Sequence, residues 1–188
     1  MLKRRITAHI DEWYRHMPQK ALFVTGARQV GKSYAIREFA RGQFDTYIEF
    51  NLFENARARR ALSEATSAVE FISRVTLLSG QSLVPGKTLV FIDEIQEAPD
   101  VMTMAKFLVK DGRCRWAFSG SMLGTEFKGA RSYPIGSVHE LSLHPLDFEE
   151  FCWAIGITDE ALGTIRSSCR DQIPVEGYLH DAMLANFR

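Results

Sequence analysis

Short apolar runs alternate along this chain with longer segments in which apolar residues recur every three or four positions. The runs are rich in β-branched and aromatic side chains, a composition typical of buried strands. Strands are expected on this basis at residues 21–25, 46–52, 89–92 and 115–118, and the alternation of residues 137–143 predicts a final strand. Helical segments are expected between the first three of these strands, so the chain is expected to contain both helices and strands.

The periodic segments predict amphipathic helices. In the first of them, apolar residues from Ile6 to Met17 fall at three- and four-residue steps until Pro18 stops the pattern. The helices expected after it cover residues 34–40, 54–79 with a break near residue 66, 147–154 and 174–187. Each has an apolar face that is stable only when it is buried against another element.

The stretch from Gly26 to Ser33 reads Gly-Ala-Arg-Gln-Val-Gly-Lys-Ser and fits the phosphate-binding loop pattern G-x-x-x-x-G-K-[ST]. It lies between an expected strand and an expected helix, which is the arrangement that the pattern requires. Its glycines let the main chain curve around a phosphate with successive N–H groups facing it. The nucleotide-binding residues expected here are Gly26, Ala27, Arg28, Gln29, Val30, Gly31, Lys32, Ser33 and Tyr34.

Two side chains of this loop carry chemistry. We expect Lys32 to reach the β- and γ-phosphates of ATP and to act in catalysis, and the Ser33 hydroxyl to bind Mg²⁺. The alternative is a helix-entry turn that contains Gly-Lys by coincidence. The flanking strand and helix argue against that alternative.

Two acidic residues, Asp93 and Glu94, directly follow the apolar run at 89–92. This layout is that of the Walker B element of P-loop ATPases. We expect Asp93 to organise Mg²⁺, and Glu94 to polarise the water that attacks the γ-phosphate. The alternative is local, with Asp93 and Gln96 forming a capping box at the start of a helix.

A further polar group, Ser119-Gly120-Ser121, follows the expected strand at 115–118. Polar residues at the end of a core strand lie in the crevice where open α/β sheets bind ligands. Ser119 or Ser121 is therefore a candidate sensor that hydrogen-bonds the γ-phosphate or the attacking water, with Ser119 favoured. An ordinary Ser-Gly-Ser turn is the alternative.

Together, these motifs resemble those of the AAA_14 group of P-loop ATPases in the AAA+ superfamily. The residues that carry the resemblance are Gly26–Ser33, Asp93-Glu-Ile-Gln96 with Ala98-Pro99, Ser119-Gly-Ser121 and Leu143-His-Pro-Leu-Asp-Phe-Glu-Glu-Phe151. The resemblance covers residues 3–187 and implies ATP hydrolysis with Mg²⁺. It implies a P-loop NTPase fold, in which a parallel sheet of about five strands is sandwiched between helices. It also implies that another strand separates the P-loop strand from the Asp93 strand.

One position departs from the family pattern. Many relatives carry Gly-Arg or Gly-Lys before the last core strand, where this chain has Gly136-Ser137. If that basic residue contacts phosphate in trans, its role is lost here or is taken by Lys128 or Arg131. Arg131 is the candidate arginine finger, and an exposed loop arginine is the leading alternative.

The ATPase core and its N-terminal helix are expected to occupy residues 1–156, and residues 157–188 to form a helical extension. The last helix carries an apolar stripe that still runs when the sequence stops at Arg188. In the resembling family, a DUF4143 domain follows such a helix. We therefore expect a truncated chain or gene fragment in which residues 157–188 are poorly ordered or packed against a neighbouring molecule. Burial of this helix against the ATPase core is the alternative.

Composition narrows the function classes. Lys and Arg together number 23, as do Asp and Glu, so the formal net charge is zero and gives no support for nucleic-acid binding. Cys114, Cys152 and Cys169 are widely spaced and odd in number, and they fit reduced, buried thiols better than a disulfide framework or a metal site. With neither a signal sequence nor a membrane-length apolar run, the chain is expected to be soluble and cytoplasmic.

The function expected from the sequence is Mg²⁺-dependent ATP binding and hydrolysis, with ADP as product, that drives a conformational change in an attached domain or protein partner. The alternative is a switch that binds ATP and turns over negligibly. Glu94 favours the enzyme, whereas Ser137 in place of a basic residue favours the switch. A phosphotransferase fits less well, because the sequence has no acceptor-binding lid or second basic cluster. The sequence does not decide whether DNA or a second copy of the chain is also a partner.

Overall fold

A computed structural model describes residues 2–121, 134 and 136–185. The chain falls into two compact units, one of Ile6–Pro145 and one made of Met1–Arg5 with Leu146–Arg188. The second unit thus begins before residue 157, where the helical extension is expected from the sequence. No helix within the described ranges is long and apolar enough to cross a membrane.

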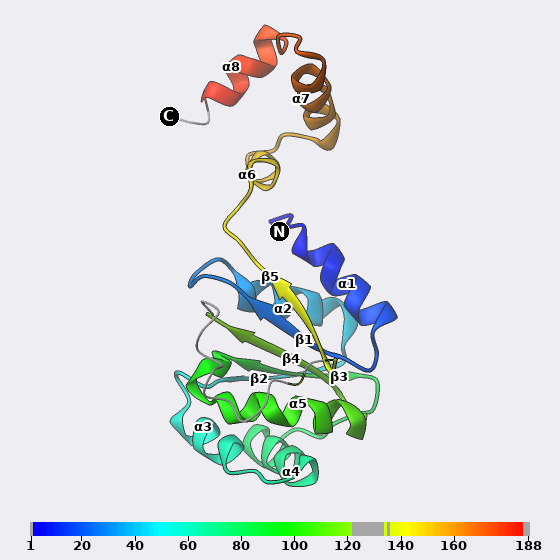
Figure 1. Ribbon diagram of the computed structural model, residues 1–188, viewed down its shortest axis with the longest axis vertical. Coiled ribbons are helices and arrows are strands. Elements are labelled where there is room, and N and C mark those ends of the chain that lie inside the picture. The colour runs from blue at the N-terminus through cyan, green and yellow to red at the C-terminus, as the bar shows by residue number, and fades with distance from the viewer. Residues whose placement is uncertain (1, 122–133, 135, 186–188) are drawn as a thin grey trace. The chain divides into compact units, whose positions relative to one another are not determined.

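Among the described residues, the first unit is built on one sheet of five parallel strands (Figure 1). The strands are β1 (Ala21–Thr25), β2 (Thr46–Asn51), β3 (Thr88–Asp93), β4 (Arg115–Gly120) and β5 (Val138–Ser142), in the spatial order β2-β3-β4-β1-β5. β4 therefore separates β1 from β3, as the family resemblance implies. Because the strands are parallel, the carboxyl ends of β1, β3 and β4 meet at the same edge of the sheet.

Helices cover both faces of this sheet. α1 (Ile6–His16) and α2 (Lys32–Gln43) pack on one face, and α3 (Ala56–Ser63), α4 (Ala68–Ser79) and α5 (Pro99–Asp111) pack on the other (Figure 1). Side chains alternate along β1, so that Leu22 and Val24 pack with α1 and α2 while Ala21 and Phe23 face the opposite core. The arrangement confirms the expected α/β sandwich and matches the P-loop NTPase fold.

Polar side chains fix where two of these helices begin. Asn55 accepts a hydrogen bond from the N–H of Ala58 at the start of α3, and Ser67 accepts one from Glu70 at the start of α4. Such caps satisfy N–H groups that have no partner inside the helix. The helix break expected near residue 66 is confirmed, and the Ser67 cap explains its position.

The second unit contains α6 (Phe148–Ala154), α7 (Asp159–Asp171) and α8 (Gly177–Ala185). A capping box between Asp147 and Glu150 starts α6. The expectation that the last helix begins at Pro174 is wrong, since α8 begins at Gly177. Its first helical hydrogen bond runs from the N–H of His180 to the carbonyl of Glu176, which leaves Pro174 in the connection before the helix.

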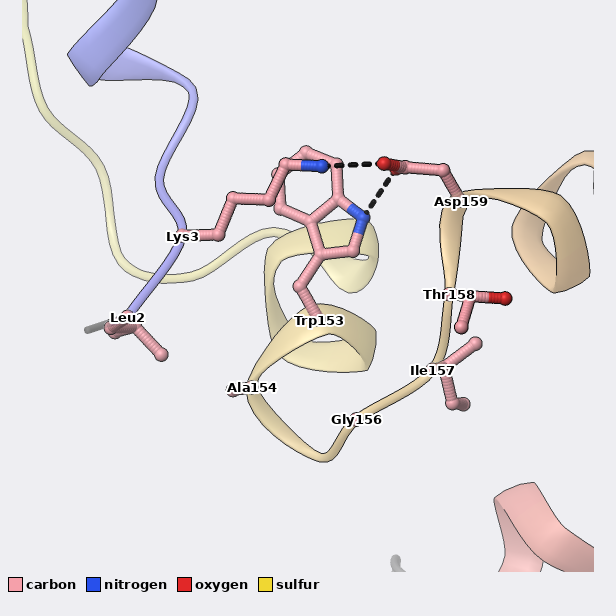
Figure 2. Close-up of a pocket in the computed structure, with 8 residues that line it drawn as sticks. All are labelled: Leu2, Lys3, Trp153, Ala154, Gly156, Ile157, Thr158 and Asp159. Atoms are coloured by element: carbon pink, nitrogen blue, oxygen red, sulfur yellow. Dashed lines mark hydrogen bonds and ion pairs between the residues drawn. The ribbon is translucent and has the colours of Figure 1, made fainter.

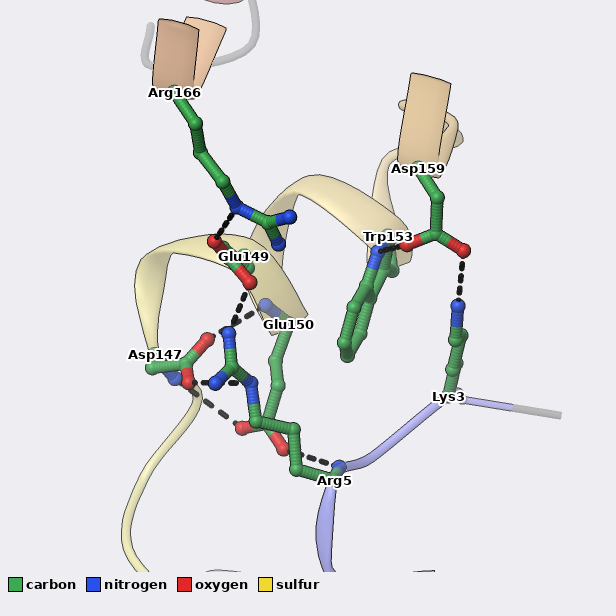
Figure 3. Close-up of polar contacts among 8 residues, drawn as sticks. All are labelled: Lys3, Arg5, Asp147, Glu149, Glu150, Trp153, Asp159 and Arg166. Carbon is green, nitrogen blue, oxygen red and sulfur yellow. Dashed lines mark hydrogen bonds and ion pairs between the residues drawn. The ribbon is translucent and has the colours of Figure 1, made fainter. Parts of the chain in front are cut away.

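Charged side chains join the first residues of the chain to α6 and α7 (Figure 3). Arg5 pairs with Asp147 at 3.2 Å, and Lys3 donates a hydrogen bond to Asp159 at 2.6 Å. The Lys3 ammonium also lies 4.2 Å from the centre of the Trp153 ring. Lys3, Trp153 and Asp159 line a pocket of about 570 Å³ (Figure 2). The Trp153 indole also donates a hydrogen bond to Asp159, at 2.8 Å. The polar groups of Lys3 and Trp153 thus both have Asp159 as a hydrogen-bond partner.

All three cysteines are free thiols. Cys114 and Cys152 are buried, as expected, but the expectation of a buried thiol is wrong for Cys169, which is exposed. Cys169 lies in the last turn of α7, and the small buried core of the second unit reaches along that helix to Ile165.

Candidate nucleotide-binding site

The loop between β1 and α2 has an unusual backbone. Gly26 has φ 148°, Gly31 has φ 97°, and Gln29, which carries a side chain, has φ 64°. Positive φ at a non-glycine residue is uncommon, and it occurs at turns, helix ends and functional sites. A Cβ atom at Gly26 would lie 2.1 Å from the carbonyl oxygen of Leu143, so this position admits no side chain. The curved backbone is the form that presents successive N–H groups to an anion.

The Lys32 ammonium lies inside this curve. The residue is 5% exposed, and its Nζ donates hydrogen bonds to the carbonyls of Gly26 at 3.1 Å and Ala27 at 2.8 Å. Burial lowers the pKa of Lys32, and the negative charges of Glu94 and Asp93 oppose that shift. A cation held against two neutral carbonyls in a buried position is suited to an incoming anion.

The Asp93 carboxylate, at the end of β3, joins three elements. One oxygen, Oδ2, accepts a hydrogen bond from the Ser33 hydroxyl at the start of α2, at 2.7 Å. The other, Oδ1, accepts from the hydroxyl of Ser119 on β4 and from the N–H of Glu94. Asp93 is 3% exposed and Ser119 is fully buried. The structure thus brings together three of the residues singled out in the sequence, because β3 and β4 are neighbours and β1 leads into the loop before Ser33.

Glu94 has a left-handed backbone, with φ 54° and ψ 50°, and is the residue that precedes the short 3-10 helix η1 (Ile95–Glu97). Its carboxylate accepts a hydrogen bond from the side-chain amide of Gln96. The capping box considered for Asp93 and Gln96 is not formed in the described residues, since Asp93 bonds to Ser33 and Ser119 instead. Gln96 also contacts Ser121, so the structure separates the two serines: Ser119 bonds to Asp93 and Ser121 to Gln96.

Comparison with known families decides the class of protein. A family model described as an AAA domain, AAA_14, matches residues 18–152. The chain belongs to the AAA_14 family. With the fold described above, it is an AAA domain with the P-loop NTPase fold.

Comparisons with individual proteins add little to the AAA_14 assignment. No curated protein matches the chain. A structure of C. elegans PCH-2 is similar at 11% sequence identity, with a TM-score of 0.44. The similarity covers 92% of this chain and 45% of that one, so the chain spans less than half of its length. A likeness at this level carries no argument about the AAA_14 domain.

Asp93 at the end of β3 and Ser33 at the start of α2 suit a Mg²⁺–nucleotide complex in this AAA_14 domain. Hydroxyl and carboxylate oxygens are ligands that Mg²⁺ accepts, and those of Ser33 and Asp93 lie 2.7 Å apart. In the part of the chain that the structure describes, no three His, Cys, Asp or Glu side chains gather into a metal site of their own. A Mg²⁺ ion at Ser33 and Asp93 would therefore complete its coordination with water and phosphate oxygens.

The remaining candidates of the AAA_14 domain are exposed or half-buried, or they lie outside the described ranges. Ala27, Arg28, Gln29 and Tyr34 are exposed, as the rim of a nucleotide site would be, and Val30 is half-buried. Arg131, the candidate arginine finger, and Lys128 lie outside the described residues. Sequence reasoning did not assign Gln96 a place in the site, although its position two residues after Glu94 was the available signal.

Proposed function

We propose that this AAA_14 domain binds ATP with Mg²⁺ and hydrolyses it, and that the cycle drives a conformational change in an attached domain or protein partner. The observation that carries the proposal is the Asp93 carboxylate, which accepts hydrogen bonds from Ser33 beside the loop and from Ser119 on β4. That single carboxylate links the expected phosphate site, metal site and sensor.

In the proposed mechanism, loop N–H groups hold the phosphates and Lys32 exchanges its two carbonyl partners for β- and γ-phosphate oxygens. Ser33 and Asp93 would hold Mg²⁺, which would neutralise charge on the phosphates when bound. Glu94 accepts a proton from the attacking water as the water oxygen bonds to the γ-phosphorus. The bond from that phosphorus to the β-phosphate oxygen breaks, giving ADP and inorganic phosphate.

A switch with negligible turnover is the second candidate, and Ser137 favours it. This residue stands where many relatives have a basic side chain, and its carbonyl accepts a hydrogen bond from the N–H of Ala21 at 2.9 Å. Ser137 therefore contributes a backbone hydrogen bond to β1, and its side chain carries no positive charge. Free thiols at Cys114, Cys152 and Cys169 support a reducing compartment, and we place the protein in the cytoplasm.

Three variants test the proposal. Lys32→Ala should abolish binding of a fluorescent ATP analogue, whereas the exposed Lys106→Ala should bind like the wild type. Glu94→Gln should keep ATP and Mg²⁺ binding but slow phosphate release by at least about 100-fold, because a general base contributes roughly 10²–10⁴-fold. Asp93→Ala should weaken Mg²⁺-dependent binding, and Glu97→Gln, on the same turn as Glu94, should change neither property.

Wild-type affinity in Lys32→Ala would refute the nucleotide site, and normal hydrolysis in both Glu94→Gln and Asp93→Ala would refute their roles. Phosphate release measured against protein concentration, with and without DNA, separates the enzyme from its alternatives. Binding without turnover under all conditions favours the switch. A rate per molecule that rises with concentration indicates a second copy as partner, and one that rises with DNA indicates a nucleic-acid role.

A further inference from the structure

We propose that Gln96 is a positioning residue that holds the Glu94 carboxylate in place for the attacking water and ties it to the end of β4. The inference rests on the proposed ATP hydrolysis, for which Glu94 is the base. It adds a residue that acts through another residue and not on the nucleotide itself.

Gln96 contacts both sides of the site. Its Nε2 donates hydrogen bonds to Oε2 of Glu94 and to the Ser121 hydroxyl, the latter at 3.2 Å. Its Oε1 accepts a hydrogen bond from the N–H of Ser121 at 3.3 Å. Gln96 and Ser121 are both half-buried, and Ser121 directly follows β4. One amide therefore joins the turn after β3 to the residue after β4.

These contacts fix which way the amide points. If it were reversed, Oε1 would face the Glu94 carboxylate and the NH₂ group would face the N–H of Ser121. Both pairings would be repulsive, since a carboxylate only accepts hydrogen bonds when ionised and a backbone N–H only donates. Ser121 thus holds the amide so that its donor faces Glu94.

The Glu94 side chain depends on this support. Among the described residues, Gln96 is the partner that hydrogen-bonds its carboxylate, and the charge of Glu94 also acts on Lys32. The backbone of Glu94 is in the left-handed region, which a non-glycine residue adopts at a cost. A carboxylate held through one oxygen leaves its other oxygen for a water molecule, and a misplacement of about 1 Å can cost roughly 100-fold in rate.

Substitutions of Gln96 give a sharp test. Gln96→Met keeps the length of the side chain without the donor, and Gln96→Glu keeps its shape but places a second acceptor against Glu94. Both should lower kcat by about 10- to 100-fold while the KM for ATP and the affinity for a fluorescent ATP analogue stay within about twofold. Gln81→Met, the same change in an exposed loop, is the control and should match the wild type.

A second comparison separates positioning from general damage to the structure. In a Glu94→Gln background, measured by single-turnover hydrolysis, adding Gln96→Met should change the residual rate by less than about twofold, because the base is already lost. An equal fall in both backgrounds, an unchanged kcat in Gln96→Met, or a loss of nucleotide affinity in that variant would each overturn the role of Gln96. A wild-type protein that binds ATP but does not hydrolyse it would overturn the proposed function and this inference with it. If the wild type hydrolyses ATP normally, a negative result in the Gln96 variants contradicts only the role proposed for Gln96.

Discussion

Replacing Gly26 with alanine should destabilise the fold and impair the proposed nucleotide site. A Cβ atom there would lie 2.1 Å from the carbonyl oxygen of Leu143 and 3.1 Å from its carbonyl carbon. The Leu143 backbone is held by a hydrogen bond from its N–H to the Thr25 carbonyl at 2.7 Å, so the carbonyl cannot retreat without loosening that pairing. Gly26 also has φ 148°, which an alanine rarely adopts.

The expected cost has two parts. An alanine in a positive-φ conformation costs about 1–2 kcal/mol, and forcing an overlap into a packed region adds about 1–3 kcal/mol. Together they give a loss of about 2–5 kcal/mol in the free energy of unfolding. Since 1 kcal/mol shifts the Tm of a domain of this size by about 2–4 °C, the Tm should fall by about 4–20 °C.

Substitutions at two other glycines distinguish the cost of the backbone conformation from the cost of the overlap. Thermal unfolding followed by circular dichroism measures both. Gly112→Ala has the positive φ, 74°, but its Cβ meets no described atom within 4 Å, so its Tm should fall by about 2–8 °C. Gly42→Ala lies in α2 with no such conflict and should raise the Tm by about 1–4 °C, because alanine favours helix. Binding of the fluorescent ATP analogue should be lost in Gly26→Ala alone. An equal Tm for Gly26→Ala and Gly112→Ala would refute the role given to the Leu143 carbonyl.

Two further predictions concern stability and thiol reactivity. Arg115→Ala should lower the Tm by about 4–8 °C in the same assay, because its guanidinium donates to the Met17 carbonyl at 3.1 Å and a hydrogen bond to a charged group contributes about 2 kcal/mol. Arg113→Ala, at an exposed position, should shift it by no more than about 2 °C, and equal shifts would argue against the Arg115 contact. Exposed Cys169 should be alkylated by iodoacetamide in the folded protein at mildly alkaline pH, whereas Cys114 should not, because burial raises the pKa of its thiol to about 12 and leaves little reactive thiolate. Peptide mapping by mass spectrometry would show this, and equal labelling of the two thiols would contradict it.

Much of the fold was predictable because its signals are local. Four apolar runs and one alternating segment predicted the five strands, and the glycine-rich loop predicted the β1–α2 connection. The placement of β4 between β1 and β3 came from the family resemblance and not from periodicity, which says nothing about strand order. The start of α8 was predicted wrongly, because proline is favoured in the first helical turn but does not require a helix to begin there. The first helical hydrogen bond, from the N–H of His180 to the carbonyl of Glu176, instead starts the helix at Gly177.

In the candidate site too, local motifs were predictable from the sequence, whereas contacts between residues far apart in the chain were not. The phosphate-binding pattern lies within eight consecutive residues, and Asp93 ends a strand, so a sequence reading finds both. The role of Gln96 depends on Ser121, 25 positions away, and on the fact that β3 and β4 are neighbours in the sheet. No spacing rule along the chain encodes such a contact, because parallel strands meet through a crossover of variable length. The residues proposed to bind phosphate can therefore be recognised from their local motif, whereas the contact proposed to align the base is visible only in the assembled sheet.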